Sequence, residues 1–273
     1  MNVLPPVLSI AGSDNSAGAG IQADLKTMSA LGTYGLTAVT CVVAEIPGKV
    51  SAIQGMPAAL VAEQIRLSFE AFPVKALKTG MLYSAEITRT VVETLKAIHS
   101  SGGMPPLVVD PVMVASSGDR LLESESLEGY RTGLFPLAAL VTPNLDEAEV
   151  LLGGKIDSRE ALAEAGQALV RVYGCAFLMK GGHLKGDTAA DFLVLPGGEV
   201  VWFEAPFVQG VSTHGTGCTY SAAIAAELAK GAGLVDAVGG AKRFVSEALR
   251  GYLRWDKEGG STDALHHFAR VGV

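Results

Sequence analysis

Apolar runs alternate with amphipathic stretches along almost the whole chain, and this alternation constrains the fold more than any other feature of the sequence. Six runs are rich in Val, Leu and Ile and largely uncharged, as strands buried on both faces should be: residues 7–12, 36–45, 76–80, 107–113, 140–144 and 176–181. Helical periodicity falls between them, over residues 21–31, 58–72, 85–100, 125–134 and 159–173. Strand–helix–strand units of this kind cross over with right-handed connections. They predict an α/β three-layer sandwich, with a mainly parallel central sheet and helices on both faces.

The pattern changes in the last third of the chain. Residues 191–194 and 200–203 are short strand-like segments separated by PGG, which predicts a hairpin that finishes the sheet. Two helices are predicted after it, over residues 217–230 and 234–253. No linker, repeat or low-complexity segment interrupts the sequence, so we expect one domain over residues 1–273.

Charge and cysteine content narrow the class of protein. The formal net charge of −7 argues against nonspecific binding to nucleic acid, although local amide groups can still bind an anion. The first residues lack a basic secretory signal, and the uncharged run 27–44 is broken by glycines, so no membrane span is expected. Cys41, Cys175 and Cys218 are odd in number and form no CxxC pair. A reduced, cytoplasmic protein without structural disulfides or a zinc site is predicted.

Polar segments follow four of the predicted strands, namely GSDNSAGAG, KTG, DPVM and TPNLDEAE. Ligands of open parallel sheets bind beyond the carboxyl ends of the strands, so Asp110, Asn144 and Glu147 are expected to face one cleft. Taken singly, each acid suits a helix cap or a solvated surface. Their shared position at strand ends favours instead a Mg²⁺ site, with Asp110 and Glu147 as ligands directly or through water.

The segment THGTGCTYSAAIAAELAKG contains the strongest phosphate signal. Gly215, Thr216 and Gly217 precede a long helix, where unpaired amides and the helix dipole stabilise an anion such as a phosphoryl group in transfer. Cys218 follows them, and a helix N-terminus is expected to lower a cysteine pKa below its usual value of about 8.5. The thiol then either accepts a proton or shapes the anion hole; packing under a helix cap is the structural alternative. Lys180, at the end of a predicted strand, is expected to reach the phosphates of ATP.

Other nucleotide and metal signals are weak. GAGIQA matches the loose dinucleotide pattern G-x-G-x-x-A, but five residues separate it from Gly12, at the end of the first predicted strand, so we reject it. The loop before it is predicted to contact substrate, with Asp14 and Asp24 available to hydroxyl groups. No G-x-x-x-x-G-K-[ST] sequence occurs, and the histidines show no metal-ligand spacing.

Together these motifs resemble those of the bacterial hydroxymethylpyrimidine/phosphomethylpyrimidine kinases, which have the ribokinase-like fold. The resemblance spans nearly the full chain and rests on AGSDNSAGAGIQADLKT, LKTGML, VVDPVM, SGDRLL, TPNLDEAEVL, LMKGGH, HGTGCTYSAAIAAELAKG and HHF. It implies an ATP- and Mg²⁺-dependent kinase, usually a homodimer, of thiamine biosynthesis. The implied substrates are 4-amino-5-hydroxymethyl-2-methylpyrimidine and its monophosphate.

The resemblance also implies roles for individual residues. The substrate pocket is assigned Gly12, Asp24, Glu45, Met81 and Val112. The nucleotide site is assigned Asn144, Lys180, Thr216 and Lys242, with Asp110 and Glu147 near the metal. Gly215, Thr216 and Gly217 match the anion hole, and Cys218 matches the presumed catalytic base.

The chain departs from the family pattern in two segments. Ala17 replaces a glycine of the usual SGGAG sequence, which matters only if that position needs a positive φ. In VVAEIPGKV, Glu45 replaces a pocket glutamine, and Pro47 and Gly48 replace polar residues of the expected flap. An ionised glutamate only accepts hydrogen bonds, so it loses the donor that glutamine offers a neutral ring nitrogen. Two alternatives therefore stay open: a kinase of pyridoxal, pyridoxine or a related heterocyclic alcohol, and a catalytically silent vitamin- or nucleotide-binding relative.

Overall fold

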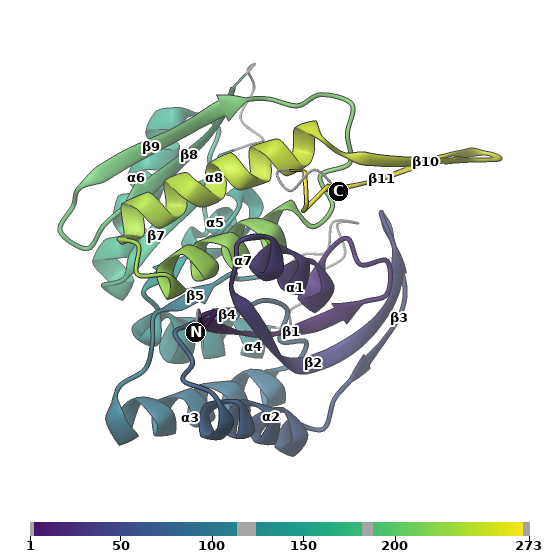
Figure 1. Cartoon of the computed structure of the whole chain (residues 1–273). Coiled ribbons are helices and arrows are strands. Elements are labelled where there is room, and N and C mark those ends of the chain that lie inside the picture. The colour runs from purple at the N-terminus through teal and green to yellow at the C-terminus, as the bar shows by residue number, and fades with distance from the viewer. Residues whose placement is uncertain (1–2, 114–123, 182–187, 270–273) are drawn as a thin grey trace.

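The computed structural model describes residues 3–113, 124–181 and 188–269, which build a nine-stranded sheet covered by helices on both faces (Figure 1). The strand order is β3-β2-β1-β4-β5-β6-β7-β8-β9. Six strands run parallel: β1 (Pro6–Asp14), β2 (Tyr34–Ile46), β4 (Ala76–Thr79), β5 (Leu107–Val109), β6 (Leu140–Val141) and β7 (Ala176–Lys180). Antiparallel strands flank them, β3 (Lys49–Gly55) at one edge and β8 (Thr188–Val194) with β9 (Val200–Pro206) at the other. The predicted three-layer α/β architecture is confirmed.

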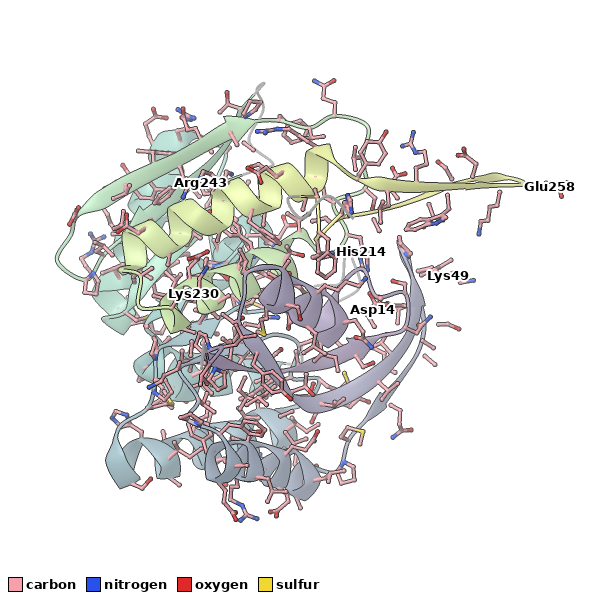
Figure 2. The ribbon with its side chains drawn as sticks, viewed as in Figure 1. Asp14, Lys49, His214, Lys230, Arg243 and Glu258 are labelled. Carbon is pink, nitrogen blue, oxygen red and sulfur yellow. The ribbon has the colours of Figure 1, made fainter. Side chains whose placement is uncertain are left out.

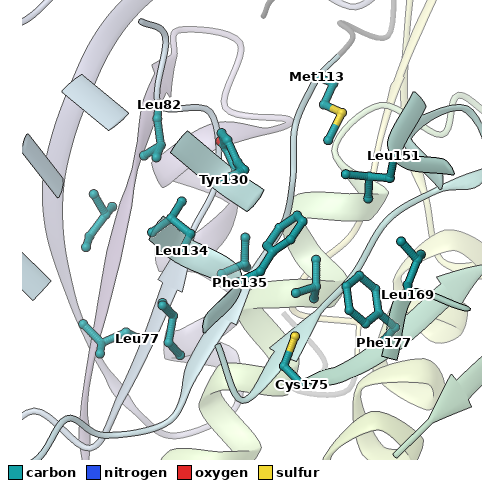
Figure 3. Close-up of a cluster of buried hydrophobic side chains, with 14 of the residues drawn as sticks. Leu77, Leu82, Met113, Tyr130, Leu134, Phe135, Leu151, Leu169, Cys175 and Phe177 are labelled. Atoms are coloured by element: carbon teal, nitrogen blue, oxygen red, sulfur yellow. The ribbon is translucent and has the colours of Figure 1, made fainter. Parts of the chain in front are cut away.

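Two separate groups of apolar side chains fill the spaces between the sheet and its helices. One group packs α1 (Gly20–Ala30), α7 (Thr216–Ala229) and α8 (Leu234–Arg250) against the sheet. The other packs α2 (Ala58–Ala71), α3 (Ala85–Gly102), α5 (Leu145–Leu152) and α6 (Arg159–Tyr173), together with the helical segment of residues 124–137. In the second group Phe135 packs edge-on against Phe177, with ring centroids 5.8 Å apart (Figure 3). Because both faces are covered, the parallel strands are apolar without alternation.

The helix α7 is buried along most of its length because its residues are small. One side of α7 packs over β1, β4 and β5, and its other sides contact α1 and α8. A run of alanines, including Ala222, Ala223, Ala225 and Ala226, has no exposed surface. Small side chains allow three neighbours to approach closely, and this places the N-terminus of α7 at the carboxyl ends of the central strands.

Some predicted boundaries are wrong, and proline or glycine accounts for most of them. The strand predicted over residues 107–113 stops at Val109. Pro111 follows two residues later, and a proline cannot donate a hydrogen bond to a neighbouring strand. The helix predicted over 125–134 is α4 (Ser124–Gly129), continued by a π-helical turn (Tyr130–Leu134) and a 3₁₀ turn (Phe135–Leu137). The helix predicted to reach residue 253 ends at Arg250, before Gly251.

Four elements have no counterpart in the predictions. The strand β3 pairs with β2 to form a hairpin with its turn at Pro47–Gly48, and α5 occupies what was read as a polar loop. The strands β10 (Leu253–Lys257) and β11 (Gly260–Ala264) form an arm that extends away from the sheet, with Glu258 at its tip (Figures 1 and 2). The motif SGDRLL lies outside the described residues, as does the end of LMKGGH. Within the described ranges, no helix is long and apolar enough to cross a membrane.

Candidate active site

A cavity of about 720 Å³ opens at the carboxyl ends of the parallel strands. Its walls come from segments far apart in the chain: the loop after β1, the β2–β3 hairpin, the ends of β5 and β7, and the N-terminus of α7. All of the predicted site residues except Asp24 line it, namely Gly12, Glu45, Met81, Asp110, Val112, Asn144, Glu147, Lys180, Gly215, Thr216, Gly217, Cys218 and Lys242. The sequence therefore placed nearly the whole set at one edge of the sheet.

Glycine is required at Gly215, where α7 begins, and Gly217 in the first turn of α7 is closely packed. Gly215 is the N-cap of α7 and has φ +77°, and a Cβ there would lie 1.7 Å from the carbonyl oxygen of Gly18. A Cβ on Gly217 would lie 3.2 Å from Lys180 Nζ and 3.6 Å from an oxygen of Asp110. Because the amides of a first helical turn lack acceptors within the helix, this turn presents N–H groups beside a lysine ammonium. The arrangement suits a phosphate group.

Lys180 and Asp110 form an ion pair directly beside this loop. Lys180 Nζ donates to Asp110 Oδ1 over 2.9 Å, and Thr142 and Ser221 donate to the same carboxylate over 3.2 and 3.3 Å. Burial disfavours the ionised form of Asp110, but Lys180 and Lys78 outweigh it and lower the pKa of the carboxyl. Asp110 is therefore held ionised beside Lys180 and the first turn of α7.

Asn144 and Glu147 begin the helix α5 with a reciprocal capping box. Asn144 Oδ1 accepts from the Glu147 N–H over 2.9 Å, and Glu147 Oε2 accepts from the Asn144 N–H over 2.8 Å. The helix-cap reading of Glu147 is thus correct, although both side chains also line the cavity. Burial raises the pKa of Glu147 to about 7, with Asp110 adding to the effect and Lys180 opposing it. The spacing N-x-x-E was present in TPNLDEAE as a signal of this helix.

The expected lowering of the Cys218 pKa is wrong. Burial on the cavity wall raises the pKa of this thiol to about 11; the charge of Lys78 opposes the rise, while Asp24 and Asp110 add to it. The position at a helix N-terminus is as expected, but the loss of water outweighs the effect of the helix there. The carboxylates that add to the rise in the pKa are close in space but distant in the sequence, so no local motif could have shown the direction of the shift.

Asp24, assigned to the substrate pocket, does not reach the cavity. It has no exposed surface, and its carboxylate accepts from Lys78 Nζ over 2.9 and 3.0 Å and from Ser9 Oγ over 2.5 Å. Asp24 lies on the buried side of α1, together with Ile21 and Ala23. In this conformation the carboxylate is a partner of Lys78, not a contact of a ligand.

Lys242, assigned to the nucleotide site, lines the cavity but already has a partner. Its Nζ lies 2.6 Å from Asp191 Oδ2, and both side chains are nearly buried. A phosphate would therefore have to compete with a carboxylate for this ammonium group.

Glu45 lies where the flap was expected, on the β2–β3 hairpin close to its turn. Its N–H donates to Asn15 Oδ1 over 2.6 Å, which ties the hairpin to the loop after β1. Burial raises the pKa of the Glu45 carboxyl; Asp14 adds to the rise and His214 opposes it. Gly12 lines the same cavity, and a Cβ there would come within 2.7 Å of Cys41 Sγ and 3.1 Å of Met81 Cε. The pocket is closely packed on this side.

Sequence reasoning missed the pairing of His214 with Asp14. His214 Nε2 lies 3.2 Å from Asp14 Oδ2, across 200 residues of sequence, and the two side chains lie close together in Figure 2. Asp14 also accepts from the Ser16 and Ala19 backbone N–H groups over 2.7 and 2.8 Å. Burial opposes ionisation of Asp14, but these partners lower its pKa to about 2. The sequence predicts Asp14 as a contact of hydroxyl groups and gives His214 no metal-ligand spacing, and nothing local relates the two residues.

Among the described residues, no cluster of three or more His, Cys, Asp or Glu side chains is placed to hold a metal. The two cavity carboxylates, Asp110 and Glu147, are a donor set that fits Mg²⁺ in a different way. Magnesium usually keeps several waters and takes one or two protein carboxylates plus phosphate oxygens. Whether these two residues serve as its ligands stays a prediction.

Comparison with known proteins gives one consistent family. The phosphomethylpyrimidine kinase family model matches residues 14–263. The hydroxymethylpyrimidine/phosphomethylpyrimidine kinase of Streptomyces coelicolor is 46% identical over 90% of each chain. An ADP complex of Bacillus subtilis pyridoxal kinase superimposes with a TM-score of 0.88 at 34% identity, covering 98% of this chain and 99% of that one. The phosphomethylpyrimidine kinase of Clostridium difficile gives 0.76 at 40% identity, covering 89% and 99%. Sequence, fold and site thus lead to one conclusion: the chain belongs to the phosphomethylpyrimidine kinase family.

Proposed function

We propose that this chain transfers the γ-phosphoryl group of ATP to the hydroxymethyl group of 4-amino-5-hydroxymethyl-2-methylpyrimidine, and then to the resulting monophosphate. The proposal rests on one observation: Gly217, Lys180 and Cys218 lie together on the cavity wall. Amide groups and an ammonium group there are suited to the charge of a phosphoryl group, and a sulfur lies beside them.

In the proposed step, the hydroxymethyl oxygen forms a bond to the γ-phosphorus while the bond from that phosphorus to the β–γ bridging oxygen breaks. ADP leaves with the bridging oxygen, and the hydroxyl proton passes to the sulfur of Cys218, which enters the step as its thiolate and leaves it as the thiol. Lys180 and the amides of the first turn of α7 stabilise the charge on the transferred oxygens. Asp110 and Glu147 are the residues proposed to hold Mg²⁺, which when bound neutralises charge on the phosphates.

The pocket side of the cavity supports a flat heterocyclic alcohol as the acceptor. Gly12, Met81 and Val112 supply apolar and close-packed walls, and Glu45 supplies a hydrogen-bond acceptor for an exocyclic amino group. The acceptor and the phosphate loop share the same cavity, as a direct transfer between two bound substrates requires.

A second candidate is a kinase of pyridoxal or pyridoxine. Two observations favour it: Glu45 in place of the family glutamine, and the close superposition on the pyridoxal kinase of Bacillus subtilis. The chemistry and the phosphate loop would be the same, and only the contacts with the ring would differ.

The deciding experiment incubates the purified protein with Mg²⁺ and ATP and each of four acceptors: the pyrimidine alcohol, its monophosphate, pyridoxal and pyridoxine. Products are followed by mass, with Lys180→Met as the matched control for phosphate binding. A diphosphate formed from the pyrimidine supports the main proposal. Turnover of the pyridoxal group alone supports the second candidate. ATP binding without any product would contradict both.

We also propose that the whole chain acts as one domain and that the protein works in the cytoplasm as a homodimer. Strands from residue 6 to residue 206 share one sheet, which supports the single domain. Its three cysteines are free, which suits a reducing compartment. Sedimentation equilibrium tests the dimer, and a mass that stays that of one chain at assay concentrations would contradict it.

A further inference from the structure

A lysine ammonium lies buried at the floor of the cavity, in a place where packing alone does not require a charge. Lys78 on β4 has no exposed surface, and its Nζ donates to both carboxylate oxygens of Asp24, over 3.0 and 2.9 Å. Ser9 Oγ donates to one of the same oxygens over 2.5 Å. Burial disfavours the charged form of Lys78, but Asp24, together with Cys218 and Asp110, outweighs it and raises the pKa of the ammonium. The lysine is therefore held charged.

An ion pair in this position needs an explanation other than stability. Removing two charges from water costs several kcal/mol per ion, and apolar side chains of similar volume are often as good or better for stability. A pair that serves packing alone would have no reason to sit on the wall of a ligand cavity, which Lys78 does. A function for the charge is the better explanation.

The position of Lys78 Nζ indicates which group the charge serves. A Cβ on Gly80 would lie 2.9 Å from this atom, so the ammonium extends past the end of β4 toward the carboxyl edge of the sheet. The helix α7 packs over β4 there and carries Cys218 in its first turn.

Four charged side chains interact electrostatically with the Cys218 thiol, and they come from four different parts of the chain. Lys78 on β4 favours its thiolate, whereas Asp24 on α1 and Asp110 after β5 disfavour it. Lys180 on β7 lies within 2.9 Å of Asp110 and is itself influenced by the thiol. The backbone of Gly20, at the start of α1, also favours the thiolate. Lys78 is the cation with the largest effect on the thiol, and Asp24 holds it in place.

We propose that Lys78 is a positioning residue that holds a positive charge beneath Cys218 and so stabilises the thiolate form of this cysteine. Asp24 fixes the ammonium from the side away from the cavity. The inference rests on the proposed function in one respect. That function explains why the thiolate is needed, because the thiolate is the form of Cys218 that can accept a hydroxyl proton. Burial works against that form, and the Lys78 charge offsets part of its effect.

The test measures the alkylation of Cys218 by iodoacetamide, which needs no substrate and reports the thiolate. The peptide that contains Cys218 is followed by mass, so that buried Cys41 and Cys175 do not interfere. At one mildly alkaline pH, Lys78→Met is expected to slow the reaction about tenfold, the effect of about one pKa unit from a lost neighbouring charge.

A matched control is available on the same cavity wall. Lys242 is also a nearly buried lysine paired with a carboxylate, yet it is not among the charges with the largest effects on Cys218. Lys242→Met is therefore expected to leave the alkylation rate of Cys218 unchanged. If Lys78→Met does not fold, the double variant Asp24→Asn/Lys78→Met removes both charges with little change in shape. It is expected to show a smaller slowing, because the Asp24 charge that disfavours the thiolate is lost as well.

A chemical rescue separates the charge of Lys78 from its volume. In Lys78→Ala, propylammonium matches the missing atoms and is expected to restore the alkylation rate, whereas uncharged propanol is not. An unchanged rate in a folded Lys78→Met variant, or equal rescue by propanol, would overturn the proposal. Because alkylation is independent of turnover, a protein inactive on every acceptor would refute the proposed function without affecting this result.

Discussion

Ala17 has a backbone conformation that alanine adopts at a cost, and replacing it by glycine should stabilise the protein. Its φ is +59°, in the left-handed region, where the Cβ of an L-residue crowds the following carbonyl. The conformation is imposed by its neighbours: the Ala17 N–H donates to the Asp14 carbonyl over 3.0 Å, and Lys26 Nζ donates to the Ala17 carbonyl over 2.7 Å. Both bonds use the backbone, so Ala17→Gly keeps them.

The magnitude follows from two opposing contributions. Relief of the left-handed conformation is worth about 1–2 kcal/mol. Glycine gives the unfolded chain more freedom, which costs about 0.4–1 kcal/mol. The net gain in the free energy of unfolding is therefore expected to be about 0.5–1 kcal/mol, or a rise in Tm of about 1–2 °C for a domain of this size.

Differential scanning calorimetry of Ala17→Gly, wild type and Ala97→Gly makes the comparison. Ala97 is exposed in the interior of α3, where φ is helical, so the same chemical change there is expected to cost about 1 kcal/mol. The two variants should thus move Tm in opposite directions. If Ala17→Gly loses as much stability as Ala97→Gly, the positive φ carries no strain and the reasoning fails.

Four further outcomes are expected. Gly215→Ala places a Cβ 1.7 Å from the Gly18 carbonyl oxygen, so kcat/KM should fall about 100-fold or more; retained activity would show that the two loops can separate. Cys218→Ala should lower kcat about 100-fold or more with little change in the Kd of ATP, whereas unchanged turnover would reduce the thiol to packing. Glu45→Gln should improve the use of the neutral pyrimidine in steady-state kinetics, and a worse preference would count against the missing donor. Burial lowers the pKa of His267 from 6.5 to about 4, so only the unfolded chain gains a proton between these values. Stability should therefore fall by up to about 3 kcal/mol as pH drops from about 6.5 to 4, and a denaturant series on His267→Gln should lose that slope.

Much of the fold was predictable because its signals are local. Strands buried on both faces must be apolar throughout, and helices between them must show helical periodicity, so the order of elements and the parallel sheet could be recognised directly. Three of the strands that were missed lack such signals. The strand β3 and the arm of β10 and β11 are mostly exposed, which leaves no apolar pattern to detect.

The residues of the candidate site could be recognised for a similar reason. Asp110, Asn144 and Lys180 follow predicted strands, and a parallel sheet brings such positions to one edge. Gly215 stands directly before an alanine-rich helix and Gly217 lies in its first turn, and the structure shows that the Gly18 carbonyl excludes a Cβ at Gly215. The roles of these residues in catalysis remain predictions.

What the sequence by itself determined is which residues reach the carboxyl edge of the sheet, since hydrophobic periodicity sets the element order and topology then sets the edge. Only the tertiary structure decided what each of those residues experiences there. Asp24 turned out to hold Lys78, Asp14 to meet His214, and the pKa of Cys218 to rise instead of fall. Burial and charge at a point depend on every side chain nearby, and the side chains around these residues come from segments that are distant in the sequence.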